Sequence, residues 1–249
     1  ADGDGLVGTV VEAGERSARL LLIRDRRSRI PVFVGKRRVR GILIGRGEAA
    51  PALELARANP FVKGVVGWTD LCASEFEREL ERLAREPRLR GLRHVVQDEP
   101  DERFLLRADF RRGVRALARH GLVYEILVHS RHLPVVGEFA ASHDGQALVL
   151  DHLGKPRIAT RERAAWEEPF RALGAYPRLA CKLSGLVTEA AWNEWTSDEL
   201  RWYLDVALET FGEDRLLFGS DWPVCLLAAR DYGEVFALAT QSDGTRPLA

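Results

Sequence analysis

Ionisable side chains stand inside, or at the end of, five apolar and strand-like stretches of this sequence. They are Arg93, His94, His129, Asp151, His152, Lys182 and Asp221. A charged group is costly to bury without a partner, so its position within an apolar strand is informative. Groups of these types can bind a metal ion or transfer a proton when they are brought together. The pattern therefore predicts an active site where these strands end.

Each of these residues also has a structural interpretation. A histidine at a strand end, such as His152, is more often a hydrogen-bonded structural residue than a ligand, and Asp221 could cap the turn that follows it. His129 and His132 lack the helical i, i+4 spacing of a metal-binding pair, and either can face solvent. Because strand residues alternate between faces, we expect only one of Asp151 and His152 to point into the site.

The elements that must position these groups are repeated strand–helix units. Short β-branched runs alternate with longer amphipathic stretches from about residue 39 onward. The strand-like runs are Val39–Ile44, Val62–Trp68, Leu92–Gln97, Leu122–His129, Ala147–His152, Leu179–Ser184 and Leu216–Asp221. Helices are predicted over Glu75–Arg85 and Asp109–His120, with Gly121 as a stop, and Thr196 supplies the N-cap of another helix. Such units form right-handed crossovers and a parallel sheet.

Seven such strands are visible, whereas a closed (β/α)8 barrel of about 250 residues requires eight. The first strand must then come from residues 1–38, where the composition differs: eight of the 17 residues from Arg24 to Arg40 are Lys or Arg. We therefore predict an α/β fold, a distorted (β/α)8 TIM-type barrel over residues 39–249, preceded by an atypical Arg-rich segment, residues 1–38. The basic stretch is a phosphate-binding arm, a solvated face or a segment outside the native fold.

The overall composition is that of a globular protein, with 46% hydrophobic and 30% charged residues. The 37 basic residues balance the 37 acidic ones, so net charge does not indicate nucleic acid or an anionic membrane as a partner. No apolar run approaches the ~18 residues that a membrane span requires. Three scattered cysteines without a CxxC motif favour reduced thiols and a cytoplasmic protein. A small-molecule substrate is the partner that the sequence indicates.

Six ordered motifs between about Asn59 and Val235 resemble the amidohydrolase-related lactonases, which include aldonolactone and 2-pyrone-4,6-dicarboxylate lactonases. These motifs are NPFVKGVVGWTDL, GLRHVVQDEPDERFL, GLVYEILVHSRHLP, LVLDHLGKP, CKLSGLVTEA and RLLFGSDWPV. The resemblance implies a distorted (β/α)8 barrel, hydrolysis of a cyclic ester and usually a divalent metal ion such as Zn or Mn. Members of the pyrone-dicarboxylate branch look able to work without a metal.

Lactone hydrolysis needs a polarised carbonyl, an activated water and a proton for the leaving alkoxide. By resemblance, Asp221 is the general base, and His152 binds a metal ion or the substrate carbonyl. We expect these two side chains to face each other across the rim of the barrel, no further apart than the width of a small ligand.

The remaining expected site residues would bind the substrate. Arg93, with His94 and Gln97 beside it, could hold a carboxylate or hydroxyl groups, because the planar guanidinium binds both oxygens of a carboxylate. The other expected substrate contacts are His129, Lys182 and Trp222.

Both ends of the chain depart from the family pattern. The family opens with a His-x-His pair at the end of its first strand, whereas this sequence has no histidine before His94 and no His-x-His. After about Val235 the sequence also differs from the terminal helix of the family, and a truncated or frame-disturbed gene product would give this pattern. A catalytic Zn²⁺ usually takes three protein ligands, for which His152, Asp221 and His129 are the candidates. We therefore expect metal affinity to be weak or absent.

Two other functions fit parts of the sequence. A catalytically impaired family member would bind a small sugar acid without turning it over. A nicotinamide-dependent oxidoreductase is suggested by Gly45, Gly47 and Ala50 after the first predicted strand, with Asp70 about 20 residues further on. Pro51 in the early turns of that helix argues against this function, and the same strand–helix–strand order is expected within a barrel.

Overall fold

A six-stranded parallel sheet forms the centre of the molecule. The computed structural model describes residues 8–13, 18–22, 29–34 and 39–44 as strands, and it describes residues 53, 56–192 and 194–240 with their side chains. The sheet has the order β5-β6-β7-β8-β9-β10, and all its neighbouring strands are parallel. Its strands are β5 (Val65–Gly67), β6 (Leu89–Val95), β7 (Val123–Leu127), β8 (Leu148–Leu150), β9 (Leu179–Leu183) and β10 (Leu216–Phe218). The parallel architecture predicted from the strand–helix repeats is confirmed.

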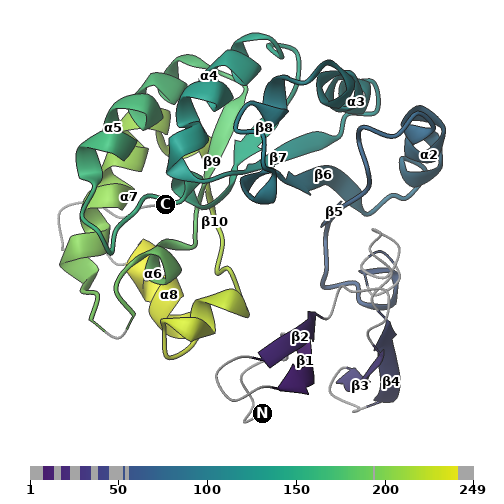
Figure 1. Cartoon of the computed structure of the whole chain (residues 1–249), viewed down its shortest axis with the longest axis horizontal. Coiled ribbons are helices and arrows are strands. Elements are labelled where there is room, and N and C mark those ends of the chain that lie inside the picture. The colour runs from purple at the N-terminus through teal and green to yellow at the C-terminus, as the bar shows by residue number, and fades with distance from the viewer. Residues whose placement is uncertain are drawn as a thin grey trace.

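Figure 1 shows this sheet curled into a half-barrel, with most of the helices around its outer side. The α-helices are α2 (Phe76–Leu83), α3 (Ala108–Ala118), α4 (Leu133–Ala141), α5 (Arg163–Ala172), α6 (Leu186–Glu189), α7 (Ser197–Phe211) and α8 (Tyr232–Thr240). Short 3₁₀ turns are η1 (Val96–Asp98), η2 (Phe104–Leu106), η3 (Ser130–His132), η4 (Asp151–Gly154), η5 (Leu173–Ala175), η6 (Glu213–Arg215) and η7 (Val224–Leu227). The half-barrel places the carboxyl ends of the strands along one edge, where barrel enzymes carry their chemistry.

The predicted helices form for the reasons that their sequences give. Helix α2 buries Phe76, Leu80 and Leu83 on one stripe, as the i, i+3, i+4, i+7 spacing requires. After α3, Gly121 adopts a left-handed φ of 64°, which suits a residue without a Cβ atom at the end of a helix. At the start of α7, the Thr196 hydroxyl accepts a hydrogen bond from a backbone N–H at 3.3 Å. These three local predictions are confirmed.

Aromatic side chains fill the space between the sheet and the helices. Phe110 of α3 packs edge-on against Tyr124 of β7, with ring centroids 5.6 Å apart, and Phe139 of α4 lies 5.9 Å from Tyr124. Trp166 of α5 stacks on Phe170 at 4.4 Å. All five side chains are fully buried. Such packing holds the helices rigidly against the outer face of the sheet and leaves the strand ends free for polar groups.

The strand predicted at Val39–Ile44 forms, but it does not belong to the parallel sheet. Strand β4 (Val39–Ile44) pairs antiparallel with β3 (Arg29–Val34), and β1 (Gly8–Ala13) pairs antiparallel with β2 (Ala18–Leu22). The expectation that residues 39–44 open the parallel repeat is therefore wrong. Only residues 35–38 join β3 to β4, and a parallel crossover needs a dozen or more residues.

The side chains of the basic stretch lie outside the described residues, so the phosphate-binding arm stays a prediction. The division of the chain at residues 38 and 39 also stays a prediction. Within the part that the structure describes, no helix is long and apolar enough to cross a bilayer. All three cysteines are free.

Candidate functional site

A network of four charged side chains occupies the centre of the half-barrel. Arg93 of β6 lies beside Glu125 of β7 in the sheet register. The Arg93 guanidinium donates to Asp151 at 3.0 Å and lies 3.7 Å from Glu125. From β9, Lys182 forms ion pairs with both acids, 2.9 Å from Asp151. Since β6, β7, β9 and the turn that follows β8 each contribute one charge, the network joins the middle of the sheet.

Both acids of this network are almost fully removed from solvent. The Glu125 side chain is 7% exposed and that of Asp151 is 0% exposed. Burial, together with the nearby charge of Asp151, raises the pKa of Glu125 above its usual value. Two buried carboxylates are tolerable here because Arg93 and Lys182 supply two compensating charges.

Next to this network, the side chains of His152 and Asp221 face each other. Their nearest atoms, Nε2 of His152 and Oδ1 of Asp221, are 3.8 Å apart. The other imidazole nitrogen, Nδ1, shares a hydrogen bond of 2.9 Å with the Ser184 hydroxyl. The expectation that His152 and Asp221 lie across a narrow gap at the strand ends is confirmed by this distance.

Burial sets the charge states of this pair. It raises the pKa of Asp221 above the usual value of an aspartate, while the His152 imidazole and the Lys155 ammonium group oppose this shift. Burial also lowers the pKa of His152, against the opposing effect of Asp221. Both shifts favour the neutral forms: His152 gives up its proton more readily than a free imidazole, and Asp221 holds a proton more tightly, which makes its carboxylate a stronger base than an exposed aspartate.

An unusual backbone segment brings His152 to this position. Four successive residues, His152 to Lys155, have left-handed φ angles of 53°, 51°, 66° and 52°. The backbone N–H of Lys155 closes this turn by donating to the His152 carbonyl at 2.8 Å. The left-handed region is unfavourable for residues other than glycine, so tertiary contacts must hold the turn.

Those contacts lie on the core side of the left-handed turn. Leu153 is fully buried, and the Trp166 indole N–H donates to its carbonyl at 2.8 Å. A Cβ atom added to Gly154 would come within 2.5 Å of Leu133, so only glycine fits there. With its middle residues fixed to the core, the turn carries His152 at its beginning and Lys155 at its end.

The prediction that only one of Asp151 and His152 points into the site is wrong. Strand β8 ends at Leu150, and the turn that follows it does not keep the alternation of a strand. As a result, Asp151 joins the ion network while His152 faces Asp221.

Two residues expected to bind substrate lie apart from this cluster. His94 stacks on Phe104 with ring centroids 4.9 Å apart, and its Nε2 atom contacts Glu99 at 2.6 Å. Alternation along β6 explains the difference, because His94 follows Arg93 and so points to the opposite face. The Gln97 amide donates to the neighbouring Asp98 at 3.3 Å. His94 therefore points away from the gap between His152 and Asp221, and the assignment of Gln97 to substrate binding stays a prediction.

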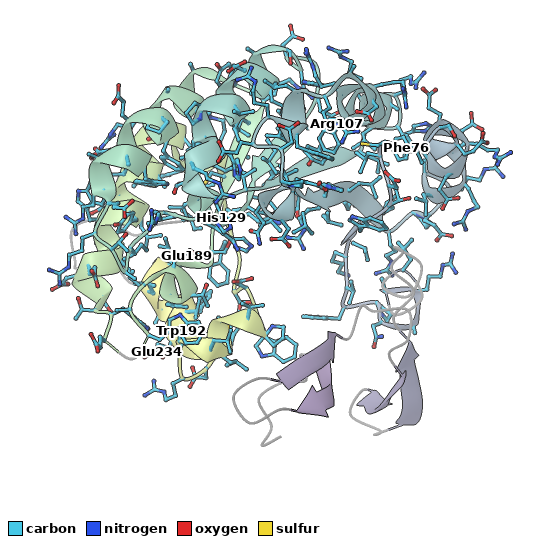
Figure 2. All side chains as sticks on the ribbon, viewed as in Figure 1. Phe76, Arg107, His129, Glu189, Trp192 and Glu234 are labelled. Atoms are coloured by element: carbon cyan, nitrogen blue, oxygen red, sulfur yellow. The ribbon has the colours of Figure 1, made fainter. Side chains whose placement is uncertain are left out.

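The other expected substrate contacts lie at the edges of the site. His129 is half-buried after β7, and its pKa is lowered first by burial and then by the nearby charge of Lys155. Figure 2 shows His129 and Glu189 on the inner side of the half-barrel. Trp222 is 58% exposed beside Asp221, so its indole is free to contact a ligand.

Four residues at the site were not among the expected ones. They are Glu125, Lys155, Ser184 and Glu189. Glu125 carries the same signal as Arg93, a charge inside an apolar strand, and could have been found in this way. Lys155 follows η4 and Glu189 ends the short helix α6; their charged groups lie 3.8 Å apart, and no periodicity marks either residue.

The described residues do not offer a complete metal site. No group of three or more His, Cys, Asp or Glu side chains among them is close enough to hold a metal ion. His152 and Asp221 make one pair of possible ligands, and His129 does not join them in such a group. Because a catalytic zinc usually has three protein ligands, the described part of the chain does not fit a metal ion by itself.

The dinucleotide-binding hypothesis finds no support. Gly45, Gly47 and Ala50 lie outside the described residues, and the strand before them belongs to an antiparallel hairpin rather than to the parallel sheet that the motif requires. Asp70 accepts a hydrogen bond from the backbone N–H of Cys72 at 2.9 Å, as in an ordinary turn.

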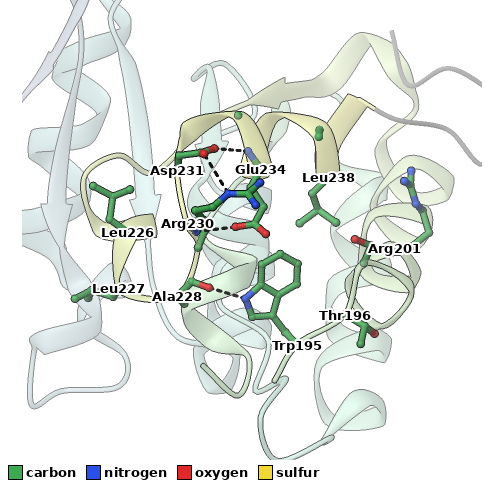
Figure 3. A pocket seen from close by; sticks show the side chains of 14 residues that line it. Trp195, Thr196, Arg201, Leu226, Leu227, Ala228, Arg230, Asp231, Glu234 and Leu238 are labelled. Atoms are coloured by element: carbon green, nitrogen blue, oxygen red, sulfur yellow. Dashed lines mark hydrogen bonds and ion pairs between the residues drawn. The ribbon is translucent and has the colours of Figure 1, made fainter. Parts of the chain in front are cut away.

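A separate pocket opens between α7, η7 and α8 (Figure 3). In it the Trp195 indole donates to the Ala228 carbonyl at 2.6 Å, and Glu234 accepts from the backbone N–H of Arg230 at 2.6 Å. None of the expected site residues lines this pocket. Its polar groups bond to one another, so we place the chemistry at the strand ends instead.

Comparison with known proteins identifies the class of this chain. It belongs to the amidohydrolase family, whose pattern matches residues 13–246. A solved structure of an amidohydrolase from Burkholderia multivorans with bound zinc superposes with a TM-score of 0.71 at 48% identity, covering 76% of this chain and 68% of that chain.

Two relatives carry a more specific name. An L-fucono-1,5-lactonase of Burkholderia multivorans is 50% identical over 206 residues, which cover 78% of this chain and 68% of the relative. An L-fucono-1,5-lactonase of Burkholderia ambifaria is 38% identical over 193 residues, which cover 76% of this chain and 66% of that relative. The chain thus matches about two thirds of the length of each relative.

Proposed function

We propose that this chain hydrolyses a cyclic ester, the lactone of a sugar acid, with Asp221 as the base that activates water. The observation that carries the proposal is the close pair of a desolvated carboxylate and a neutral imidazole, 3.8 Å apart at the carboxyl ends of two parallel strands. The two relatives named as L-fucono-1,5-lactonases support the same reaction class.

The reaction adds one water molecule across the ring ester. Asp221 takes a proton from water as the water oxygen bonds to the carbonyl carbon. The bond between that carbon and the ring oxygen then breaks, and the ring oxygen receives the proton from Asp221. The product is an open-chain hydroxy acid. No proton is left over in this sequence, because Asp221 returns to its carboxylate form.

His152 positions the substrate in this proposal. Its Nδ1 atom is held by Ser184 at 2.9 Å, so its Nε2 atom has a fixed direction toward the gap beside Asp221. In the tautomer with the proton on Nε2, the imidazole donates a hydrogen bond to the substrate carbonyl or to the attacking water. No step of this proposal depends on a metal ion, since no three possible metal ligands lie together among the described residues.

Arg93 and Lys182 contribute positive charge on the other side of the gap. Arg93 uses one guanidinium nitrogen for the ion pairs with Asp151 and Glu125, and its side chain is 38% exposed. Its remaining N–H groups are therefore available for a substrate hydroxyl or carboxylate. Lys182 is bound by two acids, so we assign it to holding the network rather than to the substrate.

The test is the rate of lactone opening in a pH-indicator assay with L-fucono-1,5-lactone and related aldonolactones. We expect Asp221→Asn to lower turnover at least ~100-fold, because amide nitrogen and oxygen cannot accept the proton of water at neutral pH. The control is Asp144→Asn, which removes an exposed carboxylate outside the site and should leave the rate unchanged.

Two results would count against the proposal. A rate within a few-fold of the parent would remove Asp221 from the role of base. If lactones or sugar acids raise the melting temperature without any turnover, the chain is a non-catalytic family member that binds a sugar acid.

A further inference from the structure

The left-handed turn delivers two side chains to the site, and the proposed reaction so far uses only His152. We propose that the Lys155 ammonium group binds the carbonyl oxygen of the lactone and stabilises the negative charge that this oxygen gains when water attacks. This inference rests on the proposed function and adds a catalytic residue to it.

The backbone around Lys155 gives the first reason. Three residues of the turn that are not glycine adopt left-handed angles, each of which is unfavourable relative to an ordinary conformation. An extended segment would avoid this cost but would separate the two ends of the turn. The hydrogen bond from Lys155 N–H to the His152 carbonyl keeps them together at 2.8 Å. Strain of this kind is characteristic of functional sites.

The ion pairs of the site give the second reason. Arg93 and Lys182 each contact two buried acids. Within the described residues, Lys155 has one ion pair, with Glu189, at a loose 3.8 Å. Its side chain is 20% exposed, so it is shielded from bulk water without being locked in place. Of these three cations, Lys155 has the most capacity to bind an incoming anion.

The position of Lys155 relative to the reacting groups gives the third reason. Its ammonium nitrogen lies 3.8 Å from Glu189, which Figure 2 shows with His129 on the inner side of the half-barrel. Its backbone is hydrogen-bonded to that of His152, the residue that faces the proposed base. Only a group in this region can act on a carbonyl that is attacked by a water molecule on Asp221.

The chemistry is balanced without a change in the charge of Lys155. The ammonium group donates a hydrogen bond to the carbonyl oxygen and keeps its protons throughout. The charge on that oxygen increases as the new bond to water forms, and it disappears when the ring C–O bond breaks. A cation in a partly desolvated site thus favours the transition state over the neutral ester.

The experiment compares lactone hydrolysis by the full chain with that of Lys155→Met, which keeps the length of the side chain but not its charge. We expect kcat/KM to fall about 100-fold or more, the usual effect of losing one donor to an oxyanion. Lys155→Arg should retain more activity than Lys155→Met, because it keeps the charge. The matched control is Lys63→Met, since Lys63 is exposed and precedes the amino end of β5, whereas the site lies at the carboxyl ends of the strands.

A second variant separates catalysis from a structural ion pair. Glu189→Gln removes the partner of Lys155 but leaves the ammonium group in the site. We expect a smaller loss than in Lys155→Met. Equal losses in the two variants, or a Lys155→Met rate within threefold of the parent, would overturn the role of Lys155 alone. Absence of turnover in the unsubstituted chain would overturn the proposed function, and this inference with it.

Discussion

At the scale of single residues, the site depends on how burial changes acids and bases. Asp221 and His152 are both shielded from water, which favours the neutral form of each. The raised pKa makes the Asp221 carboxylate a stronger base than an exposed aspartate. The pair therefore offers a base and a neutral hydrogen-bonding group side by side, without an ion pair that would neutralise the base.

This balance predicts an acid limb in the pH dependence of kcat/KM. Activity requires ionised Asp221 and should fall as the pH decreases through its pKa, which burial raises above the usual value of 3.8. The positive charge of Lys155 lowers this pKa, so Lys155→Met should move the acid limb to higher pH. The measurement is kcat/KM across the acid range for both proteins. An acid limb at or below the usual value would contradict the assignment of Asp221 as the base.

At the scale of elements, the left-handed turn after β8 is the decisive local structure. Its two middle residues belong to the core: Leu153 is fully buried, and Gly154 lies against Leu133. Its two outer residues belong to the site. Because the middle of the turn is packed in the core, the separation between His152 and Lys155 is fixed.

We expect Gly154→Ala to damage both stability and activity. The new Cβ atom would lie 2.5 Å from Leu133 in a left-handed conformation with φ of 66°. The matched control is Gly121→Ala, where φ is 64° but no atom lies within 4 Å of the new Cβ, so only the backbone strain of about 1–2 kcal/mol is added. Urea unfolding should show a larger loss for Gly154→Ala, and only this variant should also lose lactone hydrolysis. Equal effects of the two substitutions would mean that the turn is free to adapt.

At the scale of the whole molecule, the ion network holds the middle of the curled sheet together. Arg93, Glu125, Asp151 and Lys182 come from four neighbouring strands or their ends. Buried charges of this kind stabilise the fold only as a complete set. Removing one charged side chain leaves its partner buried without a compensating charge. Arg93 of the same set is also one of the proposed substrate-binding residues.

This arrangement predicts strong coupling between Glu125 and Lys182. Lys182→Met alone should destabilise the fold by about 3–5 kcal/mol, because it leaves two buried acids with only Arg93. Combining it with Glu125→Gln should destabilise the fold by less than the sum of the single variants, since one of those acids is then neutral. A double-mutant cycle from urea unfolding measures this difference. Additivity within about 0.5 kcal/mol would show that the two charges act independently.

Much of the architecture could be predicted because it follows from local sequence patterns such as hydrophobic spacing and helix-capping residues. Three local predictions agree with the structure. They are the apolar stripe of α2 (Phe76, Leu80 and Leu83), the N-cap at Thr196 and the helix stop at Gly121. The position of the chemistry was also predictable. In a parallel sheet the carboxyl ends of all strands lie at one edge, so charges at the ends of strands distant in sequence must meet there.

Tertiary structure alone decided which charges meet and how. His94 and Arg93 are neighbours in sequence but lie on opposite faces of β6. His94 therefore packs in the aromatic core, whereas Arg93 joins the ion network. The left-handed angles of His152 and Lys155 oppose the local preference of these residues, so no local pattern could predict them. They exist because Leu153 and the Trp166 indole fix the turn from the core side, contacts made between distant parts of the chain.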